Sequence, residues 1–381
     1  MIYLDNSATT KPKREVLDTY VKVSESFYGN PSSLHHIGIQ AEKLLNQARQ
    51  QIASLLGVNN NEMIFTSGGT EGNNMAIKSI ALTYKNRGKH IITSSVEHPS
   101  VIEACEQLKL LGYEVTYLPV NHEGRINLED LKLAIRPDTI LVSVMHVNNE
   151  VGTIQPIKQI GEILSQYPKI FFHVDYVQGV GKVPLPLHDC HVDLATISAH
   201  KFHGLKGVGA LYIRSSIRLQ PLLSGGGQEG KLRSGTENVA GIVAMAKALR
   251  LTMERADTSQ PKMAALKNQM REALSSINGV HIHTPIDHSA PHILNFSVEN
   301  FKAEVLVHAI EEEEVFVSST SACSSKLAEP SKVLLAMGVS ERLALSSIRI
   351  SLSDDTTEED IRIAINVIKK SINKLQKIMR R

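Results

Sequence analysis

Lys201 is the residue whose type and position first suggest chemistry. It follows the apolar run Val192–Ile197 and lies within Ser198–Gly204, among small and hydroxyl-bearing residues. Burying a lysine amine is costly unless the amine is neutral, paired or used covalently. Two interpretations are open at this point. The side chain reaches water at the strand end, as most lysines do, or its amine is a nucleophile that forms an imine with a carbonyl compound.

Polar segments follow other predicted strands as well. The glycine-rich segment Thr66–Asn74 opens a predicted helix, so its backbone N–H groups and the Thr70 hydroxyl could hold an anion. The same residues are also explained by an ordinary helix cap at Thr70. His98 precedes a proline that is expected to start a helix. It is either an aromatic plate and proton carrier or an ordinary loop histidine.

Asp175 is the companion that favours the covalent interpretation of Lys201. It ends a very apolar strand, where a carboxylate needs a cationic partner, and it precedes Lys201 by 26 residues. Since the carboxyl ends of neighbouring parallel strands meet at one crevice, we expect the two side chains to converge there. Pyridoxal phosphate requires two such groups: an amine that forms an imine with it, and a carboxylate that keeps its pyridine nitrogen protonated.

Alternating strands and helices must position these groups. Short β-branched or apolar runs predict strands at Met63–Phe65, His90–Thr93, Glu114–Leu118, Ile140–Val144, Ile170–Val174 and Leu194–Ile197. Helical patterns occupy Ala41–Leu56, Glu71–Tyr84, Val101–Leu111, Leu128–Ala134 and Ile157–Gln166. Val208–Ile213 follows a glycine-containing turn and is expected to double back. This alternation predicts an α/β fold with a mostly parallel sheet covered by helices on both faces.

The order of the predicted helices and strands changes after the long helix predicted at Asn238–Ala256. From about residue 260, helices alternate with strands at His292–Val298, Val315–Ser318 and Ser347–Ser351, before a final helix. We therefore predict a large domain at residues 15–258. Residues 1–14 and 259–381 are expected to form a smaller α+β domain.

Composition narrows the class of protein. The chain has 381 residues, 42% of them hydrophobic, and a formal net charge of +2. That balance disfavours a dedicated nucleic-acid surface. No apolar run of membrane-spanning length and no signal-peptide pattern occurs, so we expect a cytoplasmic protein. Three dispersed cysteines, Cys105, Cys190 and Cys323, disfavour a disulfide framework.

Taken together, the ordered motifs resemble those of cysteine desulfurases of the NifS/IscS type, which are class V, fold-type I pyridoxal-phosphate enzymes. The resemblance runs essentially from end to end. It rests on Tyr3–Thr10, Gly29–Ser33, Thr66–Asn74, Glu97-His98, His146–Gly152, His173–Gln178, Ser198–Gly204, Arg233–Thr236, Ser321–Cys323 and Ser346–Arg349. It implies a fold-type I large domain with a mostly parallel, mixed seven-stranded sheet and a smaller α+β domain that carries the catalytic cysteine loop.

The resemblance also implies roles around pyridoxal 5'-phosphate. Lys201 would bind the cofactor through an imine and later move protons. Asp175 would pair with the pyridine nitrogen, and Gln178 would hydrogen-bond the phenolic oxygen. His98 would stack on the ring and assist proton transfer. The phosphate would be held by the loop residues Gly69 and Thr70 and by Ser198 and His200.

Substrate and partner roles follow from the same resemblance. Arg349 would bind the substrate carboxylate through a bidentate pair, and Asn149 would lie between cofactor and substrate. Thr236 would reach the phosphate of the other subunit, which implies a homodimer.

Cys323 would be the nucleophile that takes sulfur from L-cysteine, leaving L-alanine and a persulfide. Small polar residues surround it and predict an exposed, mobile loop. The acceptor would be an iron–sulfur scaffold or a tRNA-thiolating enzyme. Thr320 replaces a glycine usual in the family, and its smaller conformational freedom bears on partner preference. No role is assigned to Cys105 or Cys190.

Three alternatives remain at this stage. The chain could be another class V enzyme, such as a selenocysteine lyase, cysteine lyase or aminotransferase, which would share everything except the need for Cys323. It could hold zinc through His188–His191 and the His200/His203 pair, although the spacing fits no closed four-ligand set. It could also be a non-enzymatic sulfur-transfer scaffold. We predict no metal, no membrane association and no direct nucleic-acid binding.

Overall fold

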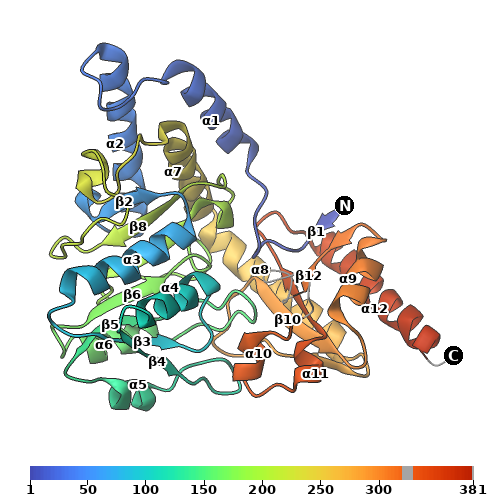
Figure 1. The fold of residues 1–381 in the computed structure, drawn as a ribbon. Helices are drawn as coiled ribbons and strands as arrows, with labels where there is room; N and C mark the ends of the chain where they lie inside the picture. Colours follow the sequence, from blue (N-terminus) through green and yellow to red (C-terminus); the bar gives the residue numbers. More distant parts are fainter. Residues whose placement is uncertain (320–328, 380–381) are drawn as a thin grey trace.

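A computed structural model of the chain describes residues 1–319 and 329–379. Its larger lobe is built on a seven-stranded sheet with the strand order β2-β8-β7-β6-β5-β3-β4 (Figure 1). The strands are β2 (Met63–Thr66), β3 (His90–Ser94), β4 (Glu114–Leu118), β5 (Thr139–Ser143), β6 (Phe171–Asp175), β7 (Leu194–Ser198) and β8 (Gly209–Ile213). The predicted α/β class and the mostly parallel, mixed sheet are confirmed.

β8 is the strand that makes the sheet mixed. It runs antiparallel to both β7 and β2, as expected for the segment after the glycine-containing turn. Its first residue, Gly209, pairs with Ser198 at the end of β7. The short 3-10 helix η2 (Ala199–Lys201) lies inside this turn. Lys201 is therefore held at the carboxyl edge of the sheet by strands on both sides of its loop.

Helices cover both faces of the sheet. The helices of this lobe are α1 (Arg14–Ser26), α2 (His36–Leu56), α3 (Gly69–Tyr84), α4 (Pro99–Lys109), α5 (Leu128–Ala134), α6 (Ile157–Leu164) and α7 (Val239–Glu254), with 3-10 turns η1 (Asn60–Glu62) and η3 (Gln228–Lys231). One apolar cluster packs α3 and α4 on the face that includes Ile91 and Leu141. Another packs α2, α5, α6 and α7 on the face that includes Ile92 and Val142. Successive strand residues thus bury opposite faces, which explains why the predicted strands read as continuous apolar runs.

The smaller lobe has its own sheet and core. The strand order is β12-β13-β10-β9, all antiparallel, and β1 pairs with β11 in parallel. The strands are β1 (Ile2–Tyr3), β9 (Val280–Ile282), β10 (Ile293–Val298), β11 (Val315–Phe316), β12 (Ser318–Ser319) and β13 (Ser347–Ser351). The helices are α8 (Ala256–Ser275), α9 (Ala303–Glu311), α10 (Lys332–Ala336), α11 (Glu341–Ala344) and α12 (Glu358–Met379).

One predicted strand of this lobe is divided in the structure. We expected a single strand at Val315–Ser318, but β11 pairs with β1 whereas β12 pairs with β13. The chain changes partners at Val317, and such a change leaves no mark in local sequence. The short strands β1 and β9 and the helix α1 were not predicted.

The apolar cores support the proposed domain division, which stays a proposal. Leu4 packs in the same cluster as residues of α8, α9 and α12, so the N-terminal segment contributes to the smaller core. Of the helices within residues 1–319 and 329–379, none combines the length and apolar character needed to cross a membrane.

Candidate active site

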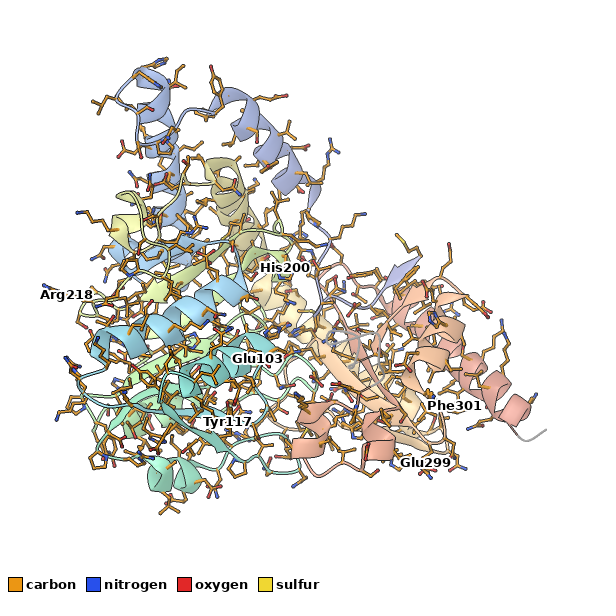
Figure 2. All side chains as sticks on the ribbon, viewed as in Figure 1. Glu103, Tyr117, His200, Arg218, Glu299 and Phe301 are labelled. Atoms are coloured by element: carbon orange, nitrogen blue, oxygen red, sulfur yellow. The ribbon has the colours of Figure 1, made fainter. Side chains whose placement is uncertain are left out.

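A cavity of about 320 Å³ lies at the carboxyl ends of β6 and β7, against the smaller lobe. Its size suits a small molecule. Ten of the predicted site residues line it: Gly69, Thr70, His98, Asn149, Asp175, Gln178, Ser198, His200, Lys201 and Arg349. Figure 2 shows His200 between the two lobes, where the N-terminal segment also passes. The strand-end residues therefore converge as the sheet topology predicted.

The Lys201 amine points toward the N-terminal segment. Nζ donates to the main-chain oxygens of Ser7 and Ala8, the latter at 2.8 Å. Thr10 Oγ1 donates to the carbonyl of His200 at 2.8 Å and holds the same segment in place. Sequence reasoning quoted this segment as part of a motif but assigned it no role, because no local pattern connects it with Lys201.

Asp175 is oriented by two donors. Its Oδ1 accepts from the Val177 N–H at 3.0 Å, and its Oδ2 accepts from Asn73 Nδ2 at 2.7 Å. Asn73 also donates to Ser100 Oγ at 2.9 Å. Sequence reasoning gave Asn73 no role. Its position four residues after Gly69, on the same face of α3, is the signal that could have revealed it.

His98 is held in one orientation and one neutral form. It is the N-cap of α4, and its Nδ1 accepts from the Ser100 N–H at 3.1 Å. Because Nδ1 accepts, the proton of the neutral ring is assigned to Nε2. Burial lowers the pKa of His98 below its usual value; the Asp175 carboxylate opposes this, and the Lys201 charge adds to it. His98 is therefore a proton acceptor or donor that starts from the neutral state.

The glycine-rich loop forms a polar end to the cavity. α3 begins at Gly69 and its N-cap is Gly68, so Thr70 lies inside the first turn and is exposed. The interpretation of Thr70 as an ordinary cap is wrong. A side chain at Gly69 would place its Cβ 3.1 Å from Val177 Cγ2, so glycine allows the close approach of loop and strand end. A second hollow of about 430 Å³ continues outward past Ser67, Ser198 and Lys206.

His200 and Gln178 complete this wall. His200 Nδ1 lies 3.2 Å from Thr9 Oγ1, and burial, followed by the charge of Lys201, lowers its pKa to about 4. Gln178 Nε2 donates to the Ser7 carbonyl at 2.9 Å. Within the described residues, the buried Gln178 Oε1 has no hydrogen-bond partner. The cavity thus offers an unused polar atom beside the carboxylate of Asp175.

Arg349 enters the cavity from β13 of the smaller lobe. Its Nη1 donates to the Asn149 carbonyl and its Nη2 pairs with Asp5 Oδ1, both at 2.9 Å. The side chain is buried, and among the described residues its Nε has no hydrogen-bond partner. A buried cation with an unused donor is suited to an anionic ligand.

Cys323 and Thr320 lie outside the described residues, but the chain on both sides of them can be placed. Ser318 pairs with Arg349 in the β12–β13 ladder, and Ser319 is four residues before Cys323. Ser331 Oγ donates to Glu150. Of the described residues that flank this segment, Ser318 is therefore paired with a residue that lines the cavity.

Of the described residues, one predicted site residue does not line the cavity. Thr236 is exposed on the loop before α7 and is not among the described residues that line it. Arg233 in the same loop is bonded to Glu71 of α3 at 2.8 Å. Cys105 and Cys190 are buried; burial raises the pKa of Cys105 to about 12 and also raises that of Cys190. Neither thiol has the ionised character of a nucleophile.

The zinc alternative is not supported by the placement of its ligands. His188 Nε2 lies 3.1 Å from Glu62 Oε2, and the described residues His188–His191 do not gather into a metal-binding group. Within the described residues, the one close group is His203, Asp354 and Asp355. The Lys13 amine contacts both of those carboxylates and supplies the positive charge there.

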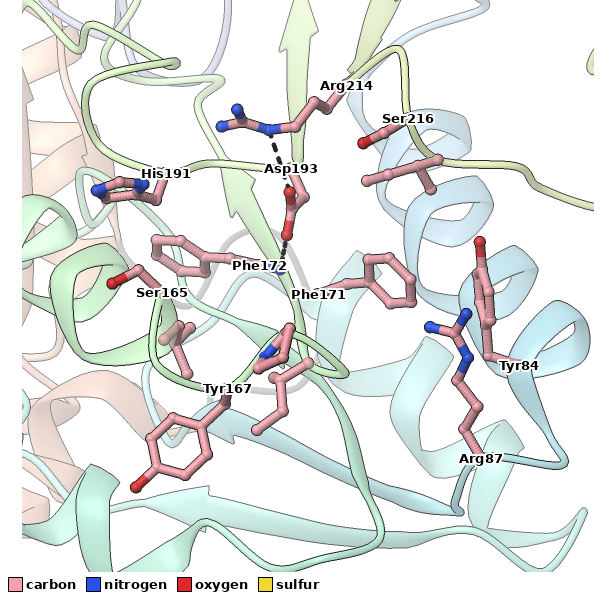
Figure 3. A pocket seen from close by; sticks show the side chains of 14 residues that line it. Tyr84, Arg87, Ser165, Tyr167, Phe171, Phe172, His191, Asp193, Arg214 and Ser216 are labelled. Carbon is pink, nitrogen blue, oxygen red and sulfur yellow. Dashed lines mark hydrogen bonds and ion pairs between the residues drawn. The ribbon is translucent and has the colours of Figure 1, made fainter.

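A further hollow of about 430 Å³ lies at the opposite edge of the large sheet (Figure 3). Phe171 is the first residue of β6, and Asp193 precedes β7, so this hollow lies at the amino ends of those strands. Asp193 is engaged by Arg214 at 3.2 Å and by the Phe172 N–H at 2.9 Å. The convergent polar groups of the first cavity make it the candidate active site.

Comparison with known proteins shows similarity over nearly the whole chain. A family model described as aminotransferase class-V matches residues 2–363. A "NifS/IcsS protein homolog" from Lactobacillus delbrueckii subsp. bulgaricus is 50% identical over 94% of this chain and 94% of its own length. A "Cysteine desulfurase IscS" from Dictyoglomus turgidum is 46% identical over 99% of this chain and 96% of its own length.

Solved structures show the same likeness. One described as a "NIFS-like protein" superposes with a TM-score of 0.92 at 39% identity, covering 98% of this chain and 99% of its own. Another, "SspA in complex with cysteine", has a TM-score of 0.83 at 34% identity and covers 94% of this chain and 100% of its own.

Proposed function

Because this chain belongs to the class-V aminotransferase family, we propose that it is a pyridoxal-phosphate-dependent cysteine desulfurase that removes sulfur from L-cysteine. The observation that carries the proposal is the convergence of Lys201, Asp175 and Arg349 on one cavity. An amine, a carboxylate and a guanidinium in one enclosed space provide for a cofactor and an amino-acid substrate together.

The residues of the cavity fit pyridoxal phosphate. Asp175, oriented by Asn73 and Val177, would hold a protonated ring nitrogen. The Oε1 atom of Gln178, which has no partner among the described residues, would bond a ring substituent. The helix start at Gly69, where no side chain of the described residues caps the helix, suits a phosphate dianion. The hydroxyls of Thr70 and Ser198 and the ring of His200 line the same end. When bound, the cofactor supplies an electron sink for charge that develops at the substrate α carbon.

Lys201 and His98 would manage the protons. Lys201 Nζ is the amine that would bind the cofactor and, once displaced by the substrate amine, would accept the proton from the α carbon. His98, neutral and with its proton assigned to Nε2, would stack against the cofactor and assist proton transfer. Both groups line the cavity, which supports their assignment.

Arg349 would bind the carboxylate of L-cysteine. Its Nε has no partner among the described residues, while the Asn149 carbonyl and Asp5 hold the other end of the guanidinium. Asn149 would lie between substrate and cofactor. These contacts orient the guanidinium before substrate arrives, which reduces the ordering that binding requires.

Cys323 would carry out the sulfur transfer. Its thiolate attacks the sulfur of the substrate, and a sulfur–sulfur bond forms as the bond between substrate sulfur and β carbon breaks. The carbon keeps the electron pair, takes up a proton and leaves as L-alanine. The persulfide stays on Cys323, so the atoms and electrons balance without an external oxidant.

The partners are proposed on the same basis. Two copies would associate so that Thr236 of one reaches the phosphate site of the other, consistent with its exposure and with the Arg233–Glu71 bond that holds its loop beside α3. The sulfur would pass to an acceptor protein, either an iron–sulfur scaffold or a tRNA-thiolating enzyme.

Replacing Cys323 with serine tests the function. We expect C323S to lose L-alanine and sulfide production from L-cysteine and to keep the visible absorbance of the bound cofactor. The matched control is C105S, which removes a buried thiol that has no assigned role and should retain turnover. Full sulfide production by C323S would contradict the assignment of the nucleophile. Absence of a cofactor band in the purified wild-type enzyme would contradict the proposed cofactor.

A further inference from the structure

Lys182 is a buried lysine that the proposed mechanism does not use. It follows β6 on the loop after Gly181, and only 7% of its surface is exposed. Its Nζ donates to the main-chain carbonyl of Lys201 at 2.8 Å. A second lysine thus contacts the backbone of the residue expected to bind the cofactor. Burying a lysine is costly, so this placement calls for a compensating role.

The loop that carries Lys182 is tightly held. The Lys182 N–H donates to the Gly179 carbonyl at 2.9 Å. Gly181 has a φ of +71°, and a Cβ there would lie 2.3 Å from Thr252 Cγ2. Thr252 in turn donates to the carbonyl of Phe202, the residue after Lys201, at 3.2 Å. Helix α7 therefore contacts both segments that carry the two lysines: the loop before Lys182 and the residue after Lys201.

Among the described residues, no carboxylate forms an ion pair with the Lys182 amine. Burial, and then repulsion from Lys201, lower its pKa to about 7, against a weaker attraction to Asp354. Asp354 itself is engaged by Lys13 and His203. Lys182 is therefore partly charged at neutral pH, and its amine contacts the backbone of Lys201.

The other groups around it are also basic or neutral. His292 is fully buried, and neither of its ring nitrogens has a hydrogen-bond partner among the described residues. Burial holds its pKa far below the usual value, and the charges of Lys182, Lys267, Arg349 and Lys201 add to this. Among the described residues, Asp354 is thus the acidic group that faces Lys182, whereas the Asp175 carboxylate lines the cavity that holds the Lys201 side chain.

Electrostatic repulsion acts equally on both members of a pair. If the ammonium of Lys201 disfavours the charged form of Lys182, the ammonium of Lys182 must disfavour the charged form of Lys201 by the same free energy. A neutral Lys201 amine is the form that is nucleophilic and that accepts a proton. The contact to the Lys201 carbonyl keeps the two side chains within range of this effect.

We propose that Lys182 is a positioning residue for Lys201, which it holds by the backbone and keeps in its neutral, reactive form through an unneutralised positive charge. The proposal rests on the proposed function only in assigning Lys201 as the cofactor-binding amine.

The test is a pH titration of the visible absorbance of bound pyridoxal phosphate in the holoenzyme, since its midpoint reports protonation of the link to Lys201. We expect K182Q and K182M to raise this midpoint by about half a pH unit or more, because a positive charge has been removed. Glutamine keeps a donor for the Lys201 carbonyl, so a shift of the midpoint in K182Q reports the loss of the charge and not the loss of the hydrogen bond.

Lys267 provides the matched control. It is equally buried, but its amine donates to Ser289 Oγ and to the Ala290 carbonyl, both at 2.8 Å, and not to Lys201. We expect K267M to leave the midpoint unchanged. K182R retains a permanent charge and should give a midpoint equal to or below that of the wild type.

Several outcomes would overturn the proposal. One is a midpoint equal to that of the wild type in K182Q and K182M, provided that cooperative thermal unfolding shows both variants to be folded. Another is an equal upward shift in K267M. If both neutral variants fail to fold, K182R decides, because a raised midpoint in that variant contradicts a role for the charge. The readout does not need turnover, so loss of desulfurase activity alone would count against the proposed function and not against Lys182.

Discussion

Single hydrogen bonds set the state of the side chains that would meet a substrate. The guanidinium of Arg349 is held at one end by Asp5 and the Asn149 carbonyl, which leaves Nε as the unused donor. His98 accepts at Nδ1 from the Ser100 N–H, which leaves Nε2 as the atom that can exchange a proton. In both cases the contacts behind the group determine what it presents to a ligand.

Replacing Arg349 with lysine should weaken substrate binding. A lysine keeps the charge but loses the planar set of donors that a carboxylate uses, so we expect KM for L-cysteine to rise about tenfold to a hundredfold. Steady-state kinetics would measure this, and the cofactor absorbance should stay as in the wild type. An unchanged KM in a cofactor-loaded R349K enzyme would contradict the proposed carboxylate site.

The lowered pKa of His98 leads to a pH prediction. Since burial shifts its pKa below the usual 6.5, the ring is neutral at pH 7 to 8 and becomes charged only as the pH falls below that usual value. If neutral His98 assists proton transfer, kcat should be level at neutral pH and decline below about pH 6.5. In H98Q, kcat should be about 10²- to 10⁴-fold lower and lack this decline. The same acidic decline in H98Q would assign it to another group.

At the scale of elements, the close packing of α3 on β7 positions the glycine-rich loop. Gly72 lies one turn inside α3, and a Cβ there would be 2.6 Å from Thr196 Cγ2 in β7. Thr196 is fully buried and bonded to His173 at 3.0 Å, so it cannot move away easily. The absence of a side chain at Gly72 therefore sets the distance between the start of α3 and the sheet.

Gly72→Ala should destabilise the protein despite the better helix propensity of alanine. Overpacking in a close-packed interface costs about 1–3 kcal/mol, against about 1 kcal/mol gained in propensity. Urea unfolding would measure the net loss. The double variant G72A/T196S removes the methyl group that clashes and should recover part of the stability. A single variant as stable as the wild type would show that the helix can shift at no cost.

At the scale of the whole molecule, Asp354 joins the two lobes. It follows β13 and contacts Lys13 at 2.7 Å and His203 at 2.8 Å, with Arg255 at 3.4 Å. His203 is two residues after Lys201, so this junction also holds the loop of the candidate site. Burial alone would raise the pKa of Asp354, but His203 and Lys13 outweigh it and hold the pKa well below its usual 3.8.

Asp354→Asn should lower the free energy of unfolding by about 2–4 kcal/mol at pH 7, because it removes the buried carboxylate shared by Lys13 and His203 and leaves Lys13 with the exposed Asp355 alone. A depressed carboxylate pKa contributes stability above the unfolded value, and this contribution is lost as the pH falls through 3.8 toward the folded pKa. The difference between wild type and D354N should hold from pH 7 to 5 and shrink below pH 4.

Chemical unfolding at several pH values would measure this. The control is D355N, whose side chain is 64% exposed and should change stability by no more than about 0.5 kcal/mol. A difference between wild type and D354N that grows as the pH falls would have the wrong sign for this junction.

The sheet and most of the site were predictable because their causes are local. Runs of apolar residues set β5, β6 and β7, and polar residues directly after them had to meet at one edge of a parallel sheet. The return of β8 after its glycine-containing turn was predicted for the same reason. The roles of Lys201, Asp175 and the other site residues stay predictions, as does that of Cys323.

What the sequence by itself determined is the kind of chemistry: an amine, a carboxylate and a guanidinium at strand ends, with motifs that resemble one family. Only the tertiary structure decided which distant segments share the cavity. Ser7 accepts from Lys201, Asn73 orients Asp175, and Lys182 holds the Lys201 loop. The physical reason is that periodicity and turn residues report a residue's immediate neighbours. A hydrogen bond between segments far apart in the chain depends on how whole elements pack, and no local pattern records it.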